Sequence, residues 1–457
     1  MPKSVHIKTF GCQMNEHDSQ RMLDQLAELG YAPATTPDEA SLVIVNTCSV
    51  RHNPENKVYS FLGTLRPLKE ARPDMVVAVA GCVAQQEGEK ILQRERCVDL
   101  VFGPDNLFRL GEMLAEVAGG KRVCDIHWAE REGRVQNFVP EEWVERGHVE
   151  GIRAYIAITK GCNNLCSFCI VPHTRGREVS RDPENILREA RGMVARGARE
   201  IWLLGQNVNS YRVSPDYGFY ELLRDMCRVE GLARLRFTSP HPKDWNNALS
   251  DLMAAEPVVC NQVHLPFQAG SDRILKAMRR RHTLAEYLEK VAYLQAAVPE
   301  VEISTDLIVG FPGETEEDFE RTLDCLRAVR FSQVFPFKYS PRPGTEAAAL
   351  PDDVPRAAKE SRLARVIALQ ETINAERQQA LAGTVQTALV DGPHPRRRGW
   401  VNGRTGGWRA VTFPGGARPG DLVRVRVTGH QGHWLLAEPE PAPETAAETP
   451  QETTHED

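Results

Sequence analysis

The sequence predicts an α/β protein with three parts: an N-terminal parallel αβ domain, a central six-fold βα partial barrel, and a small C-terminal β-barrel. Short β-rich runs alternate with amphipathic stretches over residues 1–118 and again over 152–381, as in parallel sheets with crossover helices. After residue 383 the helical periodicity ends, and Val- and Thr-containing runs are separated by Gly and Pro. With 457 residues, the chain is long enough for about three domains.

Composition narrows the class of protein. Hydrophobic residues make up 41% and charged residues 26% of the chain, which excludes a fully disordered, collagen-like or small disulfide-stapled protein. The longest apolar run, 75–84, is well short of the roughly 18 residues that a membrane span needs. The N-terminus lacks the charged start and apolar region of a secretory signal. We therefore expect a cytoplasmic protein with no membrane partner.

The N-terminal αβ domain is expected to span residues 1–118. Its first amphipathic stretch, 16–29, has apolar residues at helical spacing and stops at Gly30, a favourable C-terminal cap. The expected strands are 5–10, 42–46, 76–80 and 98–102. A polar segment at 119–151, rich in Gly, Pro and acidic residues, follows and is interpreted as a linker.

The central domain is expected to span residues 152–381. Six βα units over about 190 residues predict a barrel or partial barrel, slightly small for the eight-fold version at about 250 residues. A long amphipathic helix, 357–381, would close it. The expected strands are 154–159, 200–204, 235–239, 263–265, 302–309 and 332–339.

Two further segments complete the chain. Residues 383–437 predict a small β domain, as described above. Residues 438–457 are acidic and of low complexity, with too few apolar groups to offset the entropy of ordering. We expect a disordered tail there.

Three cysteines, Cys162, Cys166 and Cys169, lie in KGCNNLCSFCIVP, directly after the first strand of the central domain. This C-x3-C-x2-C spacing places three thiolates on one tight loop, which suits a [4Fe–4S] cluster bound at three irons with the fourth iron open to a substrate. Structural zinc is the alternative, with His173 as the nearest further ligand. Zinc sites of that kind normally have four protein ligands, so the cluster is favoured.

Three other cysteines, Cys12, Cys48 and Cys82, each follow a predicted strand by no more than two residues. The C-terminal ends of parallel strands meet along one edge of a sheet, so these thiols could converge. The alternative is ordinary buried cysteine, which is common. The repeated placement favours a second three-cysteine [4Fe–4S] site. The remaining cysteines are interpreted as packing residues: Cys97, Cys124, Cys227, Cys260 and Cys325.

The segments GCQMN, NTCSV, AGC and CNNLCSFCIVPHTRGRE resemble those of the methylthiotransferases, a family of the radical S-adenosylmethionine superfamily. The resemblance covers nearly the whole chain apart from the acidic tail. It implies an enzyme whose central domain is of the radical S-adenosylmethionine type. It also implies two [4Fe–4S] clusters, one on each cysteine set, with S-adenosylmethionine bound at the open iron of the loop cluster.

The same resemblance assigns residues around S-adenosylmethionine. Phe168 is expected to form a wall for the adenine, although by itself it also fits an ordinary core position. The segments LLGQNVNSY and STDLIVGFPGETEEDF are expected to line the pocket. Their candidate cofactor-binding residues are Gly205, Gln206, Gly310 and Gly313, whose glycines would let the backbone approach a ligand. Without the resemblance, these glycines fit ordinary tight turns equally well.

The substrate branch follows from two motifs. CIVP after the cluster loop and QNVNSY after the second strand resemble the branch that acts on N(6)-dimethylallyladenosine at position 37 of tRNA. Related branches act on threonylcarbamoyladenosine of tRNA or on an aspartate of a ribosomal protein. His173 and the segment TSPHP depart slightly from the first branch. A rival from another class is a non-catalytic RNA-binding protein with structural or redox-sensing clusters.

The C-terminal β domain supports an RNA partner independently. Residues 383–437 contain eight Arg, no Lys and two Asp, a local charge of +6, together with Trp400, Trp408 and Trp434. Arginines beside aromatic residues suit phosphate contact and base stacking. By resemblance this is a TRAM-like RNA-binding domain. The alternative is a solvated basic face with Trp in the core. The candidate RNA contacts are Arg175, Arg177, Arg181, Arg396, Arg397 and Arg398.

The resemblance also implies a reaction. The loop cluster would generate a radical that removes hydrogen from C2 of the adenine, and the second cluster would supply or carry a methylated sulfur. No catalytic side chain beyond the cluster ligands is expected. The implied partners are the tRNA substrate and a low-potential electron donor, and we expect a monomer.

Overall fold

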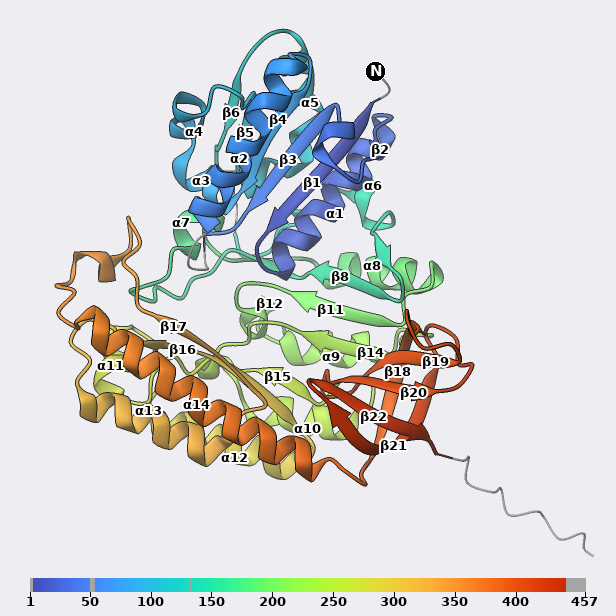
Figure 1. Cartoon of the computed structure of the whole chain (residues 1–457), viewed down its shortest axis with the longest axis vertical. Helices are drawn as coiled ribbons and strands as arrows, with labels where there is room; N and C mark the ends of the chain where they lie inside the picture. Colours follow the sequence, from blue (N-terminus) through green and yellow to red (C-terminus); the bar gives the residue numbers. More distant parts are fainter. Residues whose placement is uncertain (1–2, 50–53, 132, 441–457) are drawn as a thin grey trace, which may run out of the picture. The chain divides into compact units, whose positions relative to one another are not determined.

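The computed structural model describes residues 3–49, 54–131 and 133–440. The chain divides into two compact units, Met1–Arg377 and Gln378–Asp457 (Figure 1). The first unit contains a parallel sheet and a set of further parallel strands with crossover helices, and the second is a closed β-barrel. These features confirm the predicted fold class.

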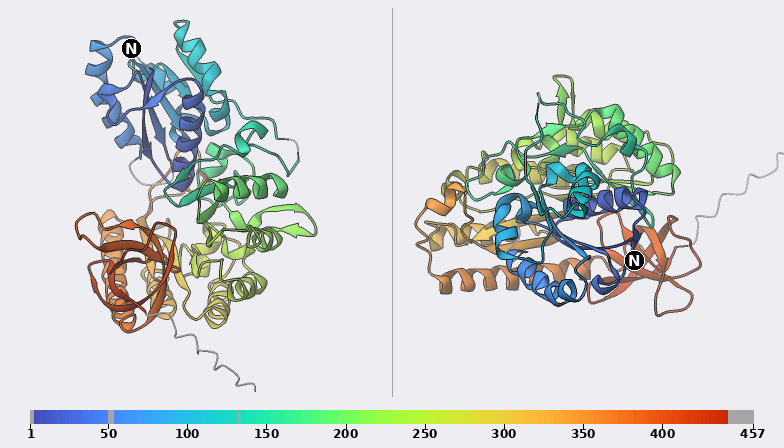
Figure 2. Two further views of the ribbon diagram at one scale, coloured as in Figure 1. Left: turned by 90° about the vertical axis from the view of Figure 1, so that its right-hand side faces the viewer. Right: turned by 90° about the horizontal axis from the view of Figure 1, so that it is seen from above.

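A six-stranded parallel sheet forms the N-terminal part of the first unit. Its central strands are apolar and almost fully buried because helices cover both faces, as the views in Figure 2 show. In sheet order the strands are β2 (Ala32–Pro33), β1 (Ser4–Phe10), β3 (Leu42–Thr47), β4 (Val76–Gly81), β5 (Leu100–Phe102) and β6 (Val123–Asp125). The helices are α1 (Gln13–Glu28), α2 (Pro54–Ala71), α3 (Cys82–Glu87), α4 (Glu89–Arg94) and α5 (Leu110–Ala118).

The register of this sheet aligns the C-terminal ends of three strands. Phe10 of β1 pairs with Thr47 of β3, and Thr47 pairs with Gly81 of β4. The chain therefore leaves all three strands at the same edge, and residues that directly follow them lie near one another.

The central part of the first unit alternates strands and helices as expected. Two groups of parallel strands share this region, and an isolated parallel bridge between Leu235 and Val259 connects β14 to the segment before β15. The strands are β8 (Arg153–Ala157), β11 (Glu200–Leu204), β14 (Arg234–Phe237), β15 (Gln262–His264), β16 (Glu302–Val309) and β17 (Gln333–Lys338). The main helices are α8 (Pro183–Ala195), α9 (Phe219–Met226), α10 (Asn247–Ala255), α12 (Leu284–Ala297), α13 (Glu316–Val329) and α14 (Arg356–Ala380).

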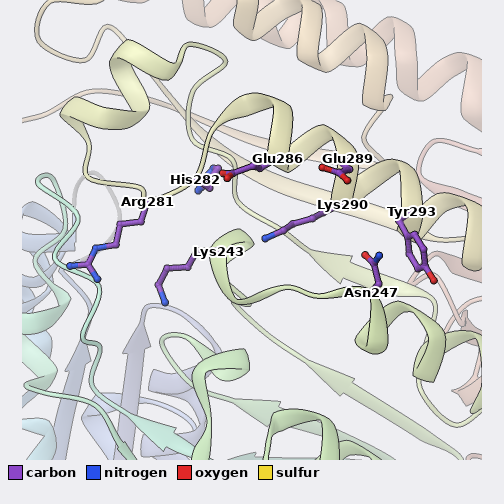
Figure 3. A pocket seen from close by; sticks show the side chains of 8 residues that line it. All are labelled: Lys243, Asn247, Arg281, His282, Glu286, Glu289, Lys290 and Tyr293. Carbon is purple, nitrogen blue, oxygen red and sulfur yellow. The ribbon is translucent and has the colours of Figure 1, made fainter.

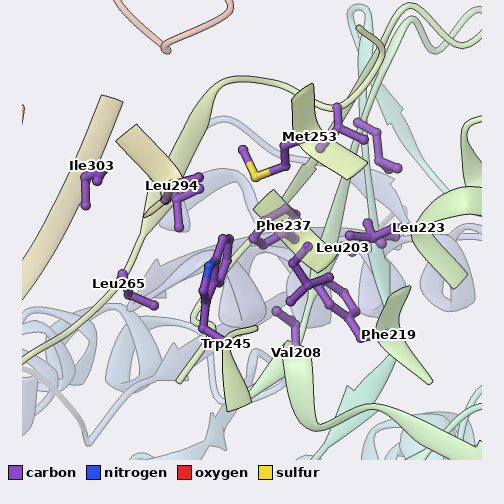
Figure 4. Close-up of a cluster of buried hydrophobic side chains, with 14 of the residues drawn as sticks. Leu203, Val208, Phe219, Leu223, Phe237, Trp245, Met253, Leu265, Leu294 and Ile303 are labelled. Atoms are coloured by element: carbon purple, nitrogen blue, oxygen red, sulfur yellow. The ribbon is translucent and has the colours of Figure 1, made fainter. Parts of the chain in front are cut away.

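One large hydrophobic core holds these strands and helices together. Figure 4 shows its centre, where Trp245 and Phe237 lie beside one another with ring centroids 6.2 Å apart. Phe219 meets Phe237 edge to face at 5.3 Å. Aliphatic side chains from several strands and helices surround these rings, so the core packs the strands against the helices.

The segment 119–151, expected as a linker, contributes to both sheets. β6 is the edge strand of the N-terminal sheet, and β7 (Val149–Glu150) pairs antiparallel with β8. A short helix, α6 (Glu141–Val144), lies between them. Short strands at a sheet edge need few apolar residues, so the polar composition of this segment did not predict them.

The second unit is a closed five-stranded barrel. Alternate residues of its strands point inward and form a small apolar core that includes Val390, Val411, Phe413 and Val425. In barrel order the strands are β18 (Val385–Pro393), β19 (Trp400–Thr405), β20 (Ala410–Pro414), β22 (Trp434–Pro439) and β21 (Leu422–Gln431).

The expected acidic tail overlaps the end of this barrel. β22 continues to Pro439, and the Glu440 carboxylate accepts a hydrogen bond from Arg424 at 3.0 Å and also pairs with Arg426. The rest of the tail, 441–457, lies outside the described residues. Among the helices in the described part of the chain, none is both long and apolar enough to cross a membrane.

Candidate functional site

The first cysteine set lies on the loop after β9 (Thr159–Lys160). Cys162 and Cys166 are buried, and Cys169 is half-buried. The turn is closed by a hydrogen bond from the Cys169 N–H to the Cys166 carbonyl at 3.0 Å. Burial raises the pKa of Cys162 to about 11 and that of Cys169 to about 12, and the neighbouring cysteines add to both shifts. The three thiols are therefore largely shielded from water and protonated when free, so a bound cation or cluster would have to displace protons.

The loop is held from two directions. The Ser167 N–H donates to the Met278 carbonyl at 3.1 Å, and the Ser167 hydroxyl donates to the Ala277 carbonyl at 2.8 Å. The Gln206 side chain accepts a hydrogen bond from the Gly161 N–H at 2.5 Å. Gly161 has a φ of +80°, and a Cβ there would lie 2.2 Å from the Arg177 carbonyl oxygen, so only glycine fits.

The second cysteine set meets at the aligned strand ends. Cys12 caps the N-terminus of α1, Cys48 directly follows β3, and Cys82 begins α3. Cys48 and Cys82 are 1% and 2% exposed. The Cys48 thiol hydrogen-bonds to Cys12 and, with the Arg175 guanidinium, lowers the pKa of Cys12 to about 6 against the effect of burial. Cys12 therefore favours the thiolate, the form that binds iron.

Hydrogen bonds of two amide side chains, Asn15 and Asn46, hold the backbone around this second site. The Asn15 amide donates to the Asn46 side chain at 3.1 Å and to the Thr47 carbonyl at 3.0 Å. The Cys12 thiol donates a hydrogen bond to the side-chain oxygen of Asn15 at 3.3 Å. These contacts link α1 to the ends of β3 and fix the positions from which the cysteines project.

Arg175 connects the two cysteine sets. It ends the short helix α7 (Val171–Arg175), which begins two residues after Cys169 and packs against α3. Its guanidinium is 3% exposed and donates to the Asp18 carboxylate at 2.8 Å. Burial opposes the charge of Arg175, but Asp18, Cys82 and Cys12 outweigh it and raise the arginine's pKa.

Comparison with known proteins identifies the family. The sequence pattern of the Radical SAM superfamily matches residues 156–326, and that of Uncharacterized protein family UPF0004 matches residues 4–103. The tRNA-2-methylthio-N(6)-dimethylallyladenosine synthase of Moorella thermoacetica is 46% identical over 95% of this chain and 97% of its own length. The synthase of the same name from Syntrophotalea carbinolica is 44% identical over 93% of this chain and 97% of its own.

The chain belongs to the tRNA-2-methylthio-N(6)-dimethylallyladenosine synthase family. The solved radical S-adenosylmethionine methyltransferase TsrM from Kitasatospora setae shares its fold, with a TM-score of 0.56 over 76% of this chain and 74% of that one, at 16% identity. The cobalamin-dependent radical enzyme OxsB has a TM-score of 0.52 over 81% of this chain and 56% of that one, at 11% identity. Both likenesses support the fold of this synthase-family chain.

The cofactors of the synthase-family chain are S-adenosylmethionine and [4Fe–4S] clusters. The donor sets fit clusters, because each consists of three thiols gathered from one loop or one sheet edge. Within the described residues, no three His, Cys, Asp or Glu side chains converge closely enough to hold a single metal ion. Structural zinc normally takes four protein ligands around one centre, whereas a [4Fe–4S] cluster binds each of three thiolates at a different iron.

The loop after β11 fits a ligand beside the first cysteine set. A Cβ at Gly205 would lie 2.1 Å from the Thr159 hydroxyl, so the backbone here is as close as glycine allows. The Thr159 hydroxyl and the Asn207 side-chain oxygen are buried without a hydrogen-bond partner among the described residues. Unsatisfied buried polar atoms are costly, so they favour a polar ligand at this place.

The other residues expected to contact S-adenosylmethionine are Gly310, Gly313 and Phe168. Gly310 and Gly313 follow β16 with φ of +70° and +78°. Their N–H groups donate to Glu314 at 2.6 Å and to Asp353 at 2.7 Å. Phe168 is half-buried against a small apolar cluster that contains Phe311 and Tyr339. The assignment of these residues to S-adenosylmethionine stays a prediction.

Two of the expected RNA contacts are corrected by their burial. Arg181 is 0% exposed, donates to the Ala157 carbonyl at 2.9 Å and pairs with Glu189 at 2.6 Å. Arg175 faces Asp18 and the second cysteine set, as described above. Neither side chain is available to a bound nucleic acid, because both are engaged inside the first unit. Arg177 is exposed, and its contact with RNA stays a prediction.

The barrel presents its basic and aromatic residues outward. Arg396, Arg397 and Arg398 are exposed between β18 and β19. Arg397 lies over the Trp400 ring at 5.0 Å, and Arg404 lies over the Trp408 ring at 4.5 Å. Trp434 is 38% exposed, and no tryptophan belongs to the apolar core of the described barrel. The alternative that placed the tryptophans in the core is therefore wrong.

A cavity of about 440 Å³ lies beside the loop that precedes α12 (Figure 3). Its lining mixes cations, carboxylates and polar groups. Both of its lysines have partners: Lys243 pairs with Asp244, and Lys290 donates to the Pro242 carbonyl. It contains none of the cysteines, so it is not the cofactor site. The lining residues are Lys243, Asn247, Arg281, His282, Glu286, Glu289, Lys290 and Tyr293.

Sequence reasoning missed Asp18, Asn15 and Arg280, which contact one cysteine set or its supports. Asp18 and Asn15 lie on an amphipathic helix, where polar residues normally face solvent. Arg280 lies in the run Arg279–Arg281, and a run of charges is typical of a solvated surface. Only the position of Asn15, three residues after Cys12 in GCQMN, gave a usable signal.

Proposed function

We propose that this protein methylthiolates C2 of N(6)-dimethylallyladenosine at position 37 of tRNA, with S-adenosylmethionine as radical source and methyl donor. The observation that carries the proposal is that two buried cysteine sets lie at opposite ends of one short helix, α7. Cys169 precedes this helix, and its last residue, Arg175, faces Cys12 and Cys82. The relatives at 44% and 46% identity carry the name of this activity.

The proposed roles of the chain are to hold, orient and shield. When bound, S-adenosylmethionine and the two clusters supply the radical, the methyl group and the site of the sulfur. Cys162, Cys166 and Cys169 hold one cluster, and Cys12, Cys48 and Cys82 hold the other. Gly205, Gln206, Gly310, Gly313 and Phe168 border the S-adenosylmethionine. The low exposure of Cys48, Cys82 and Cys166 supports a site from which water is excluded.

Each of the three parts of the chain has its own proposed role. Residues 1–118 carry the second cluster, residues 152–381 carry the radical chemistry, and residues 383–437 bind tRNA through Arg396, Arg397 and Arg398, with Arg177 as a further contact. The arginine–tryptophan pairs of the barrel, in which Arg397 is exposed and the other members are half-buried, support this last role. The proposed setting is a cytoplasmic monomer that receives electrons from a low-potential donor.

Product analysis tests the function. The protein is reconstituted anaerobically with iron and sulfide and given a reductant, S-adenosylmethionine and tRNA carrying N(6)-dimethylallyladenosine. We expect the 2-methylthio nucleoside by mass spectrometry. A parallel reaction with tRNA carrying threonylcarbamoyladenosine serves as the control. Product only in that control, or 5′-deoxyadenosine with neither tRNA, would overturn the proposal.

Iron analysis tests the second cluster. Two [4Fe–4S] clusters require about eight irons per chain, and Cys12→Ala is expected to leave about four. Cys227→Ala, which changes a half-buried cysteine packed against the central core, is the matched control and should retain about eight. An unchanged iron count in Cys12→Ala would remove Cys12 from the ligand set.

A further inference from the structure

Arg280 is a buried cation that the proposed function does not use. It lies between α11 (Asp272–Ala277) and α12, and it is 5% exposed. In the part of the chain that the structure describes, no carboxylate forms an ion pair with it. A buried guanidinium is costly unless an anion or several hydrogen bonds compensate its charge, so its position calls for an anionic neighbour.

The nearest group that can become anionic is a cluster ligand. One terminal nitrogen of Arg280 donates to the Cys166 sulfur at 3.4 Å, and the other donates to the Pro266 carbonyl at 2.8 Å. The Nε atom of Arg280 has no hydrogen-bond partner among the described residues. Binding of a cluster converts the Cys166 thiol to a thiolate, which would supply the missing negative charge.

The segment around Arg280 is built to hold this contact. Ser167, the residue after Cys166, donates to the Met278 and Ala277 carbonyls, so the two loops are joined directly beside the contact. Arg279 and Arg281, which flank Arg280, both have a φ of +56°. Two left-handed non-glycine residues within three positions are rare, and such backbone is typical of functional sites.

Two buried histidines lie close to Arg280. Burial first, and then Arg280, lowers the pKa of His282 to about 4, and the same two causes lower the pKa of His241. The His282 ring nitrogen Nδ1 lies 3.1 Å from the Arg280 carbonyl. Both imidazoles are buried, so the surroundings of Arg280 on this side are largely shielded from solvent.

We propose that Arg280 is a positioning residue that raises the reduction potential of the [4Fe–4S] cluster held by Cys162, Cys166 and Cys169. The inference rests on the proposed function for the presence of this cluster. Reduction adds one electron from a low-potential donor and makes the cluster more negative. A cation 3.4 Å from a ligand sulfur stabilises the reduced form more than the oxidised form. Hydrogen bonds to the sulfurs are a known determinant of cluster potential.

A redox titration tests this role without tRNA or S-adenosylmethionine. Arg280→Gln, Arg280→Lys and the control Arg279→Gln are prepared in a Cys12→Ala parent, so that the signal comes from the loop cluster alone. Arg279 is a suitable control because it is the adjacent arginine, is exposed and pairs with Glu346. Iron content is measured first, and the reduced cluster is then followed by electron paramagnetic resonance against potential.

At the parent's midpoint, Arg280→Gln should lower the ratio of reduced to oxidised cluster about tenfold, equal to about 59 mV for a one-electron couple. Arg280→Lys, which keeps the charge, and Arg279→Gln should stay near the parent. Loss of iron in Arg280→Gln alone, with Arg280→Lys at the parent's midpoint, would also support the charge requirement. An unchanged midpoint in iron-replete Arg280→Gln, or loss of iron in both variants, would overturn it. A parent without iron would overturn the proposed function itself.

Discussion

At the scale of single residues, two arginines of the segment after the cysteine loop differ in what surrounds them. Arg177 is exposed, whereas Arg175, two positions earlier, is buried against Asp18 and the second cysteine set. Asp18 is 157 positions away in the sequence. The local sequence, PHTRGRE, contains nothing that separates the two arginines, so both were expected to contact RNA.

Arg175→Gln should therefore act on stability and not on RNA binding. Removing the guanidinium leaves the largely buried Asp18 carboxylate without its arginine partner, and we expect the free energy of unfolding to fall by about 3 kcal/mol. Urea unfolding of the cluster-free protein measures this change. Arg177→Gln is the matched control and should stay within about 0.5 kcal/mol. A tRNA affinity lost in Arg175→Gln with unchanged stability would contradict this account.

At the scale of helices, one carboxylate joins α1 to α8. Glu189 of α8 is 0% exposed and pairs with Arg21 of α1 and with Arg181 before α8. Burial alone would raise the pKa of Glu189, but the two arginines outweigh it and lower the pKa. The pair with Arg21 therefore fixes α1, the helix that follows Cys12, against α8 of the central region.

Glu189→Gln should destabilise the first unit, because it leaves two buried guanidinium groups without an anion. We expect a loss of about 3–5 kcal/mol in urea unfolding near neutral pH. Because the folded pKa is lowered, this stabilisation is complete above the ordinary pKa of 4.5 and is lost as the pH falls below it. Glu184→Gln, at an exposed pair with Arg191, should cost about 1 kcal/mol or less. Equal losses in both variants would rule out the buried contact as the cause.

At the scale of the whole molecule, charge is distributed unevenly along the chain. The formal net charge is −6, yet residues 383–437 carry +6 and residues 438–457 carry −7. The average therefore conceals a basic barrel. Its exposed arginines, in part stacked on tryptophans, suit a polyanion with bases, as argued above.

The barrel's contribution to tRNA binding is measurable through salt dependence. Replacing Arg396, Arg397 and Arg398 by Gln should reduce the slope of log affinity against log salt by about 2, from roughly 0.7 per phosphate contact. Arg327, Arg356 and Arg365 are exposed and paired with carboxylates, so the same triple change there is the control and should leave the slope unchanged. Fluorescence anisotropy at several salt concentrations gives both slopes. Equal slopes for the two triple variants would exclude these barrel contacts.

The sequence by itself predicted the order of the main strands and helices and grouped six cysteines into two sets. Hydrophobic periodicity is a local property, and each of Cys12, Cys48 and Cys82 follows its own strand in the printed sequence. Because parallel strands end at one edge, that placement was enough to predict that the thiols meet. The short strands at 119–151 escaped this reasoning, since two or three residues give no period to detect.

Only the tertiary structure decided which charged residues serve the cysteine sets. Arg280 contacts Cys166 across 114 positions, and Arg175 contacts Asp18 across 157. The burial of an arginine depends on elements that pack against it from elsewhere in the chain, and the residues beside it in sequence carry no record of them. The thiols could therefore be found from their spacing, whereas their positively charged neighbours could be found only once the chain was folded.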